Sequence, residues 1–397
     1  MEIKSPTLFL EINNSNTIFS VGDEDEDKNF KLIYKHIVSL QGIKSCEFTD
    51  FELTLNDLKK NIYFIEQKLN FTFKEITLII NNFNCSFVNL AGFKKLNGSQ
   101  ILKENITYIL NSLKSSIDET EIKKTILHIF NSEYSLDKKK IENLPIGLFG
   151  NFYSHELSFC LINNNDYKNL NNLFNKCNLK IRKIFLKNFI EGICTSNDNP
   201  NLNTFFQIQI NDKNSHIFYF ENDSLKFEQN FNFGIELIAK DISKVTSLKI
   251  ETVKKIIENI KLNKDHLDDE LVEKKLIDNE IYKKIRKKLL YEIARARIEE
   301  LLEIIIINNI NLASHNKKVK EIFLNINDNS HMNCFKDIYS YFFSKNNFNL
   351  KFSNSITTED LIHNVNRLVH FGWKKEAIPI TQLKKSILAR FFDLIFG

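Results

Sequence analysis

The sequence lacks several features that mark particular classes of protein. Its six cysteines are scattered and form no C-x-x-C pair, so their spacing predicts no metal site, and we expect reduced, mostly buried thiols. The net charge is only +4, which does not indicate a nucleic-acid partner. No signal peptide opens the chain, and the longest apolar stretches, such as Leu301–Ile307, are too short to span a bilayer. Together these absences predict a cytoplasmic protein.

The 397 residues are too many for one ordinary core and predict two halves. Short apolar runs alternate with segments of helical spacing, which favours an α/β layer. Each half opens with a strand, a tight turn and a second strand, and this recurrence indicates an internal duplication. The four strands that open the two halves are predicted at Thr7–Ile12, Thr17–Val21, Phe205–Ile210 and His216–Phe220.

The rest of the chain follows the same alternation of helices and strands. Helical spacing covers Leu55–Leu69 in the first half, and Glu236–Ile260 and Leu271–Ile307 in the second. A polar stretch with Pro200, Ser196–Asn203, is the best candidate for a linker between the halves. Lys320–Asn325 is predicted to be a later strand.

One segment in the first half carries a family resemblance. It reads HIFNSEYSLDKKKIENLPIGLFG, and it resembles a segment of the bacterial cell-division family FtsA with an H-x-I-P-x-x-Y-x-[IL]-D core and an N-P-x-G-L-x-G ending. Gln41–Asp50, Lys176–Ile190 and Phe231–Ser243 resemble three further family stretches in the same order. The matching positions of the first segment are His128, Tyr134, Leu136, Asp137, Pro145, Gly147, Leu148 and Gly150.

The resemblance implies an α/β, actin-like (ribonuclease H-like) fold of two halves, with an FtsA-type subdomain inserted in the first half. Residues 1–81 and 163–196 would form the first half, and residues 82–162 the insertion. Residues 197–370 would form the second half, with about 225–290 as its outer subdomain. A linker over 371–380 would then lead to an amphipathic helix at 381–397.

Relatives of this fold bind ATP with Mg²⁺ on two glycine-rich turns, because glycine reaches positive φ and lets backbone N–H groups approach phosphate. The chain has only 10 glycines, and none falls in these turns. On this resemblance we expect a pseudo-ATPase with weak nucleotide binding at most, in which Lys213 could still neutralise a phosphate. In the alternative interpretation, the asparagines simply cap tight turns. The residues at the candidate nucleotide site are Glu11, Asn13, Asn14, Asn211, Asp212, Lys213, Asn214, Arg297, Glu300 and Asn327.

The C-terminal segment Thr381–Phe396 has helical spacing with one apolar face and basic flanks, which is typical of an interfacial membrane helix. The alternative is a helix packed on the protein's own core. FtsA proteins carry a membrane-binding tail at this position, so the resemblance favours the membrane. The predicted membrane-binding residues are Leu383, Lys384, Lys385, Ile387, Leu388, Arg390, Phe391, Phe392, Leu394 and Ile395.

The resemblance implies an adaptor that tethers filaments of FtsZ, the tubulin-like division protein, to the cytoplasmic face of the inner membrane. It also implies self-association into filaments and contacts with downstream division proteins. A basic cluster on a predicted helix, formed by Lys283, Lys284, Arg286 and Lys287, is a candidate site for the FtsZ C-terminal peptide or simply a solvated face. Two other hypotheses are an ATPase or sugar kinase of the same superfold, and a scaffold for pilus assembly of the PilM type.

Overall fold

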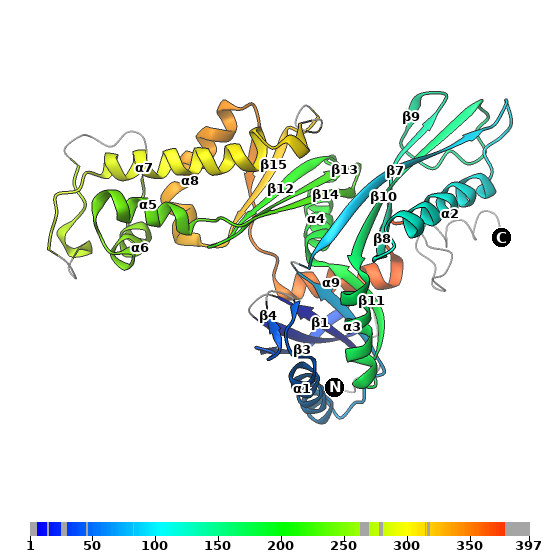
Figure 1. Ribbon diagram of the computed structural model, residues 1–397, viewed down its shortest axis with the longest axis horizontal. Helices are drawn as coiled ribbons and strands as arrows, with labels where there is room; N and C mark the ends of the chain where they lie inside the picture. Colours follow the sequence, from blue (N-terminus) through cyan, green and yellow to red (C-terminus); the bar gives the residue numbers. More distant parts are fainter. Residues whose placement is uncertain are drawn as a thin grey trace. The chain divides into compact units, whose positions relative to one another are not determined.

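The structure is a computed structural model, and it describes residues 6–13, 16–24, 30–44, 47–81, 83–262, 270–277, 281–313, 315 and 318–377. The chain divides into two compact units (Figure 1). Unit 1 contains residues 1–203, 221–227 and 356–397, and unit 2 contains residues 204–220 and 228–355. None of the helices in the described ranges has the length and hydropathy needed to cross a bilayer.

The central sheet of unit 1 has five strands in the order β11-β6-β1-β2-β3. β1 pairs antiparallel with β2 and parallel with β6, and its residues are almost all buried, as expected for a strand covered on both faces. These strands are β1 (Thr7–Ile12), β2 (Thr17–Glu24), β3 (Phe30–Val38), β6 (Glu75–Ile80) and β11 (Lys180–Leu186).

Among the described residues of unit 1, four helices pack against this sheet or against each other. They are α1 (Phe51–Leu69), α3 (Asn164–Lys176), α4 (Lys187–Asp198) and α9 (Thr358–Phe371). Local chemistry sets the ends of α1: the Asp50 side chain accepts a hydrogen bond from the Leu53 amide, and Asn70 ends the helix in the left-handed conformation.

A second sheet is inserted between β6 and β11, with the strand order β7-β10-β8-β9. One helix, α2 (Lys103–Thr120), packs against it (Figure 1). The helix lies close to β7 because Gly92 has no side chain: a Cβ at this position would come within 2.3 Å of the Ile109 side chain. The strands are β7 (Cys85–Lys95), β8 (Lys124–Leu136), β9 (Lys139–Ile141) and β10 (Phe152–Asn163).

Unit 2 holds a five-stranded sheet in the order β14-β13-β12-β15-β16. The turn of the β13–β14 hairpin has Asn222 and Asp223 at positive φ, and residues 221–227 belong by their contacts to unit 1. The strands are β12 (Phe205–Ile210), β13 (Ser215–Glu221), β14 (Ser224–Phe231), β15 (Glu321–Ile326) and β16 (Asn349–Phe352). The helices are α5 (Glu236–Thr246), α6 (Ile250–Asn259), α7 (Lys287–Leu302) and α8 (Asn329–Lys345).

The two five-stranded sheets have the same topology. Counted in chain order, the first strand of each sheet pairs antiparallel with the second and parallel with the fourth. The fourth strand pairs parallel with the fifth. The described chain is therefore a duplicated α/β fold with an insertion in the first copy. This confirms the predicted actin-like, two-half fold class.

One helix prediction was wrong in part. Helical spacing was expected throughout Leu271–Ile307, but α7 begins only at Lys287. Ahead of α7, Leu271 pairs with Arg286 instead, and the Val272 amide donates to the Ile285 carbonyl at 2.8 Å. This long-range pairing satisfies backbone groups that a helix would otherwise use, so tertiary structure overrides the local helical spacing.

Candidate functional site

The turn between β1 and β2 is closed by asparagine side chains. The Asn13 amide nitrogen donates to the Asn16 carbonyl at 3.0 Å, and Asn13 Nδ2 donates to Asn16 Oδ1 at 3.2 Å. Asn81, which follows β6, donates through Nδ2 to Asn13 Oδ1 at 3.1 Å. The predicted site residue Asn14 lies outside the described residues. Sequence reasoning missed Asn81, which no motif indicated.

The acidic residue before this turn is not available as a free carboxylate. Glu11 is 2% exposed, and its Oε1 accepts a hydrogen bond from Lys187 Nζ at 2.7 Å. Lys187 is the first residue of α4. The ion pair offsets the cost of burying the Glu11 charge.

The turn between β12 and β13 repeats the first turn almost bond for bond. The Asn211 amide nitrogen donates to the Asn214 carbonyl at 2.9 Å, and Asn211 Nδ2 donates to Asn214 Oδ1 at 2.8 Å. The amide of Asn327 donates to the Ile210 carbonyl at 3.1 Å, just as the amide of Asn81 donates to the Ile12 carbonyl at 3.1 Å. The duplication therefore extends from the sheets to the hydrogen bonds of both turns.

The second turn also has a backbone neighbour. A Cβ on Gly234 would lie 2.0 Å from the Asn211 carbonyl oxygen, and the amides of Ile235 and Glu236 donate to the Asn211 and Asp212 carbonyls at 3.0 Å each. Asp212 and Lys213 have exposed side chains. Gly234 is needed here because only a residue without a Cβ allows this close approach.

The geometry of both turns differs from that of a glycine-rich phosphate cradle. Such a cradle presents unhindered backbone N–H groups to the ligand. Here amide side chains bond across each turn, and the first amide of each turn already donates to a carbonyl. The residues present therefore do not fit a triphosphate in the way that glycines would.

Two residues of the candidate nucleotide site, Arg297 and Glu300, form hydrogen bonds within unit 2. Arg297 Nε donates to Asp241 Oδ2 at 2.5 Å, and Arg297 Nη1 donates to Glu300 Oε2 at 2.5 Å. The hydrogen bond that Arg297 donates to Asp241 raises the pKa of Arg297, burial of the guanidinium lowers it, and the pKa is raised overall. Arg297 thus joins α7 to α5, since Asp241 lies on α5.

The basic cluster lies mainly ahead of α7 rather than on a helix, which corrects the expectation. Lys283 Nζ donates to the Ser247 carbonyl at 2.8 Å, and Lys287 Nζ lies 3.5 Å from Glu270 Oε2. Lys284 and Arg286 are exposed. Two of the four cations therefore contact their own unit, and two point to solvent.

The predicted membrane-binding residues, from Leu383 to Ile395, all lie outside the described residues. Immediately before them, residues 373–377 form a feature that sequence reasoning missed, which we name the C-terminal strap. The amide of Asn131 donates to the Lys375 carbonyl at 2.6 Å, and the amide of Ala377 donates to the Ile129 carbonyl at 2.7 Å. The strap thus pairs with β8 at the edge of the inserted sheet.

Side chains hold the strap at both ends. Trp373 Nε1 donates to the Asp223 carbonyl at 2.9 Å. Glu376 accepts from Lys183 Nζ at 2.8 Å and lies 3.1 Å from His128 Nδ1. Burial alone would raise the pKa of Glu376, but the Lys183 charge and the His128 contact outweigh it and lower that pKa to about 2. Glu376 is therefore a buried carboxylate.

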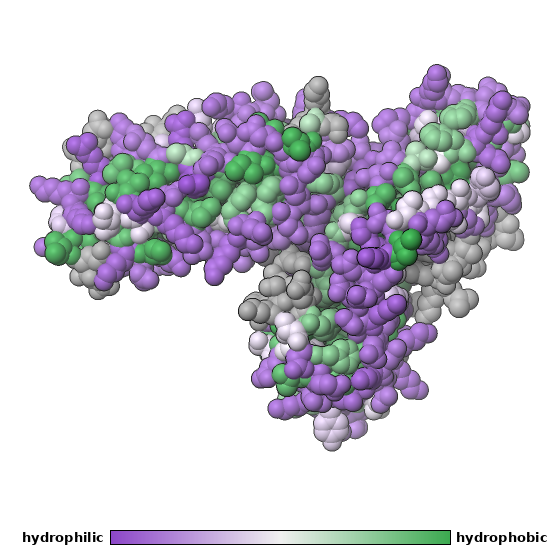
Figure 2. Space-filling view, viewed as in Figure 1, coloured by the Kyte–Doolittle hydropathy of each residue, from purple (hydrophilic) through white to green (hydrophobic). Residues whose placement is uncertain are grey.

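The inserted sheet exposes aromatic side chains. Phe93 on β7 and Phe152 on β10 stack with ring centroids 5.6 Å apart, although they are 58% and 42% exposed. Tyr108 on α2 is 58% exposed. Figure 2 shows apolar surface over the part of unit 1 that carries these elements. Exposed apolar patches of this kind mark contact surfaces.

Fold and turns thus define a duplicated actin-like chain with asparagine-closed turns. No protein-family model matches it. It is 25% identical over 318 residues to the cell division protein FtsA of Buchnera aphidicola subsp. Baizongia pistaciae (strain Bp), covering 79% of this chain and 73% of that relative. It is 22% identical over an alignment of 405 residues to FtsA of Buchnera aphidicola subsp. Acyrthosiphon pisum (strain APS), covering 98% and 94%. The chain therefore resembles FtsA proteins over nearly its whole length.

Among solved structures, a chain of a PilM-PilN type IV pilus biogenesis complex is similar with a TM-score of 0.48 and 9% identity, covering 88% of each chain. MreB 5 of Spiroplasma citri bound to AMPPNP gives a TM-score of 0.42 and 11% identity, covering 92% of this chain and 96% of that one. At TM-scores below 0.5 these similarities add nothing to the fold assignment, which rests on the strand topology of the two sheets.

Proposed function

We propose that this protein is a cell-division adaptor of the FtsA type, which tethers FtsZ filaments to the cytoplasmic face of the inner membrane at the division site. The observation that carries the proposal is the similarity to FtsA over 98% of the chain. The duplicated fold with an inserted sheet supports it. On this proposal the protein is a peripheral membrane component of the division machinery, recruits downstream division proteins and binds no nucleic acid.

Membrane attachment would come from the tail at 381–397. Its bulky apolar residues would be buried at the headgroup level, and each basic residue near an anionic surface adds about 1 kcal/mol. Deleting 381–397 should release the protein from anionic vesicles in a sedimentation assay. The matched control Asp393→Asn keeps the apolar face and should sediment at least as well as the parent chain. Equal sedimentation of truncated and full chains would remove the tail from the proposal.

Catalysis is not part of the proposal. We propose that the protein acts as a pseudo-ATPase, because asparagine side chains close both turns and Glu11 is paired with Lys187. A calorimetric titration with ATP and Mg²⁺ should show no binding at micromolar nucleotide. Micromolar affinity with turnover would instead support the alternative, an actin-superfamily ATPase or kinase.

The proposed partner contact is the FtsZ C-terminal peptide on the basic cluster. Its exposed members, Lys284 and Arg286, are the residues to change, because Lys283 and Lys287 contact their own unit. The variant Lys284→Glu/Arg286→Glu should lose binding to the peptide. The matched control Lys254→Glu, a change of one exposed lysine on α6, should retain it. Capture of a pilus-assembly protein in place of FtsZ would favour a PilM-like scaffold.

Self-association would use the exposed aromatics of the inserted sheet. Replacing Phe93 by Lys removes one ring of the stacked pair and places a charge in the patch. We expect this variant to remain monomeric under conditions in which the parent chain pellets as filaments. Tyr63→Lys on α1 is the matched control, since Tyr63 is also exposed, at 63%, but lies outside the inserted sheet.

A further inference from the structure

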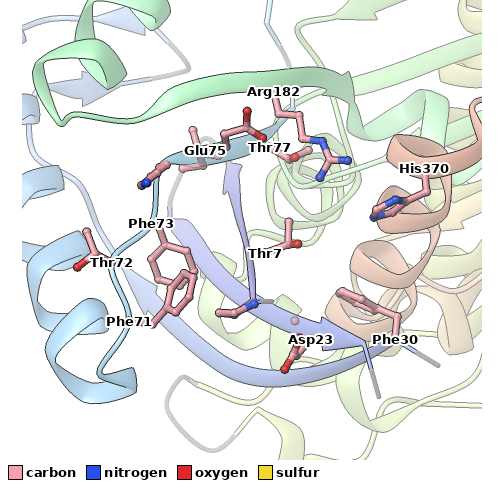
Figure 3. A pocket seen from close by; sticks show the side chains of 14 residues that line it. Thr7, Asp23, Phe30, Phe71, Thr72, Phe73, Glu75, Thr77, Arg182 and His370 are labelled. Atoms are coloured by element: carbon pink, nitrogen blue, oxygen red, sulfur yellow. The ribbon is translucent and has the colours of Figure 1, made fainter. Parts of the chain in front are cut away.

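Unit 1 contains a cavity of about 540 Å³ at the end of the sheet opposite to the β1–β2 turn (Figure 3). It lies where β1 begins, β2 ends and β6 begins, so the length of β1, roughly 20 Å, separates it from Asn13. Its volume is within the usual range of small-molecule sites, about 300–1,000 Å³. No feature of the proposed adaptor function uses this cavity.

A β-bulge presents an arginine, Arg182, in the cavity wall. Ile181 pairs with Ile76 and Lys183 pairs with Thr77, so Arg182 is the extra residue between them. A bulge re-aims the side chain that it carries, and Figure 3 shows the Arg182 guanidinium extending into the cavity. No described carboxylate forms an ion pair with it. The guanidinium is therefore available for a planar anion such as a carboxylate.

A buried hydroxyl lies in the same wall. Thr77 is 0% exposed, and its Oγ1 has no hydrogen-bond partner. A buried hydroxyl without a partner is destabilising, so a ligand that bonds to Thr77 would satisfy a group that the described residues leave without a hydrogen bond. Figure 3 shows Thr77 beside Arg182, so one carboxylate could bond to both groups.

The opposite wall is aromatic. Phe71 and Phe73 pack edge to face with centroids 5.1 Å apart, and Phe73 is buried. Two acidic residues, Asp23 and Glu75, also line the cavity and would repel a dianion or a triphosphate. The lining thus combines the Arg182 guanidinium and the exposed Lys74 with apolar walls and two carboxylates.

We propose that this cavity binds a small amphipathic monocarboxylate, with its carboxylate on Arg182 and Thr77 and its apolar body against Phe71 and Phe73. The proposal is independent of the adaptor function. It names a ligand class different from nucleotide and a site separate from both asparagine-closed turns.

The test uses 3-phenylpropionate as the probe in a calorimetric titration of the full chain, followed by ligand-observed NMR. We expect saturable binding with a Kd on the order of 1 mM, as small ligands of this size show. The uncharged 3-phenylpropionamide should bind at least tenfold more weakly, and inorganic phosphate should not compete. No saturable binding at 10 mM probe, or equal binding of the amide, would overturn the proposal.

Three variants locate the site. Arg182→Gln should weaken binding about tenfold or more, whereas Lys180→Gln, which removes one charge from an exposed residue of the same strand, should leave it unchanged. Thr77→Val should weaken binding several-fold while keeping the thermal stability of the chain, because it replaces an unpartnered hydroxyl by a methyl group. If Arg182→Gln or Thr77→Val binds like the parent chain, the ligand is elsewhere and the proposal fails.

Discussion

Removing the carboxylate of Glu376 is the sharpest perturbation of unit 1, because this one side chain joins the C-terminal strap to two other elements. Lys183 on β11 and His128 on β8 both contact it, at 2.8 and 3.1 Å. The Lys183 side chain is 17% exposed and that of His128 is fully buried. Glu376→Ala would leave both nitrogen groups without their partner.

The magnitude follows from the burial of the partners. Breaking a buried ion pair by removing one partner costs about 3–5 kcal/mol. Lys183 keeps some access to water, so we expect Glu376→Ala to lower the free energy of unfolding of unit 1 by about 2–4 kcal/mol. Glu376→Gln retains one acceptor without the charge and should cost about half as much. Lys374→Ala removes an ion pair to Asp223 whose lysine is 56% exposed, and it should cost about 0–1 kcal/mol.

Urea unfolding of the three variants measures their free energies of unfolding. Amide hydrogen exchange shows which part of unit 1 is destabilised. In Glu376→Ala the amides of Asn131 and Ala377, which bond between strap and β8, should exchange faster than in the parent chain. The amides of the β1–β2 pair should not change. A Glu376→Ala variant within 0.5 kcal/mol of the parent, with protected strap amides, would refute the role given to this network.

Two further predictions concern acid stability and the second turn. Burial lowers the pKa of His155 in unit 1 and of His331 in unit 2 to about 3 each. Their folded pKa lies below the unfolded value of 6.5. As the pH falls from 6.5 toward 3, the unfolded state binds a proton that the folded state excludes. The stability that is fully present above pH 6.5 is therefore lost progressively over this range. At pH 5 each histidine should therefore cost about 2 kcal/mol of unfolding free energy. Urea unfolding at pH 5 and 7.5 measures this, and a His155→Gln variant should show a smaller difference; equal losses in both would contradict the assignment. Gly234→Ala should destabilise unit 2 by about 2–4 kcal/mol, because the added Cβ overlaps the Asn211 carbonyl, and a midpoint of thermal unfolding equal to that of the parent would show that the turn can move at no cost.

Local patterns in the sequence were sufficient for the strands and turns that begin each half. The expected strand Thr7–Ile12 agrees with β1, and Phe205–Ile210 agrees with β12. Both are rich in apolar residues and are followed directly by an asparagine, so pattern and turn chemistry indicate the same structure. The expected duplication followed from these two units, and the matching strand order confirms it.

Local sequence patterns could not predict the pairing of segments that are distant in the chain. The strap is short and contains two lysines, and only contact with β8 and Asp223 makes it a strand-like element. Leu271 and Arg286 lie in a segment of helical spacing, but they pair with each other as a β-bridge. Asn81 joined the first turn without any motif, because its role depends on the pairing of β6 with β1. In each case a partner distant in sequence decides the structure.

The most direct test of the adaptor proposal is reconstitution on vesicles. FtsZ filaments are sedimented with vesicles that contain anionic lipid, in the presence of the full chain, of the chain without residues 381–397, or of neither. We predict that FtsZ pellets with vesicles only when the full chain is present. FtsZ that stays in the supernatant with the full chain, while the chain itself pellets with vesicles, would contradict the proposal that this protein links the two.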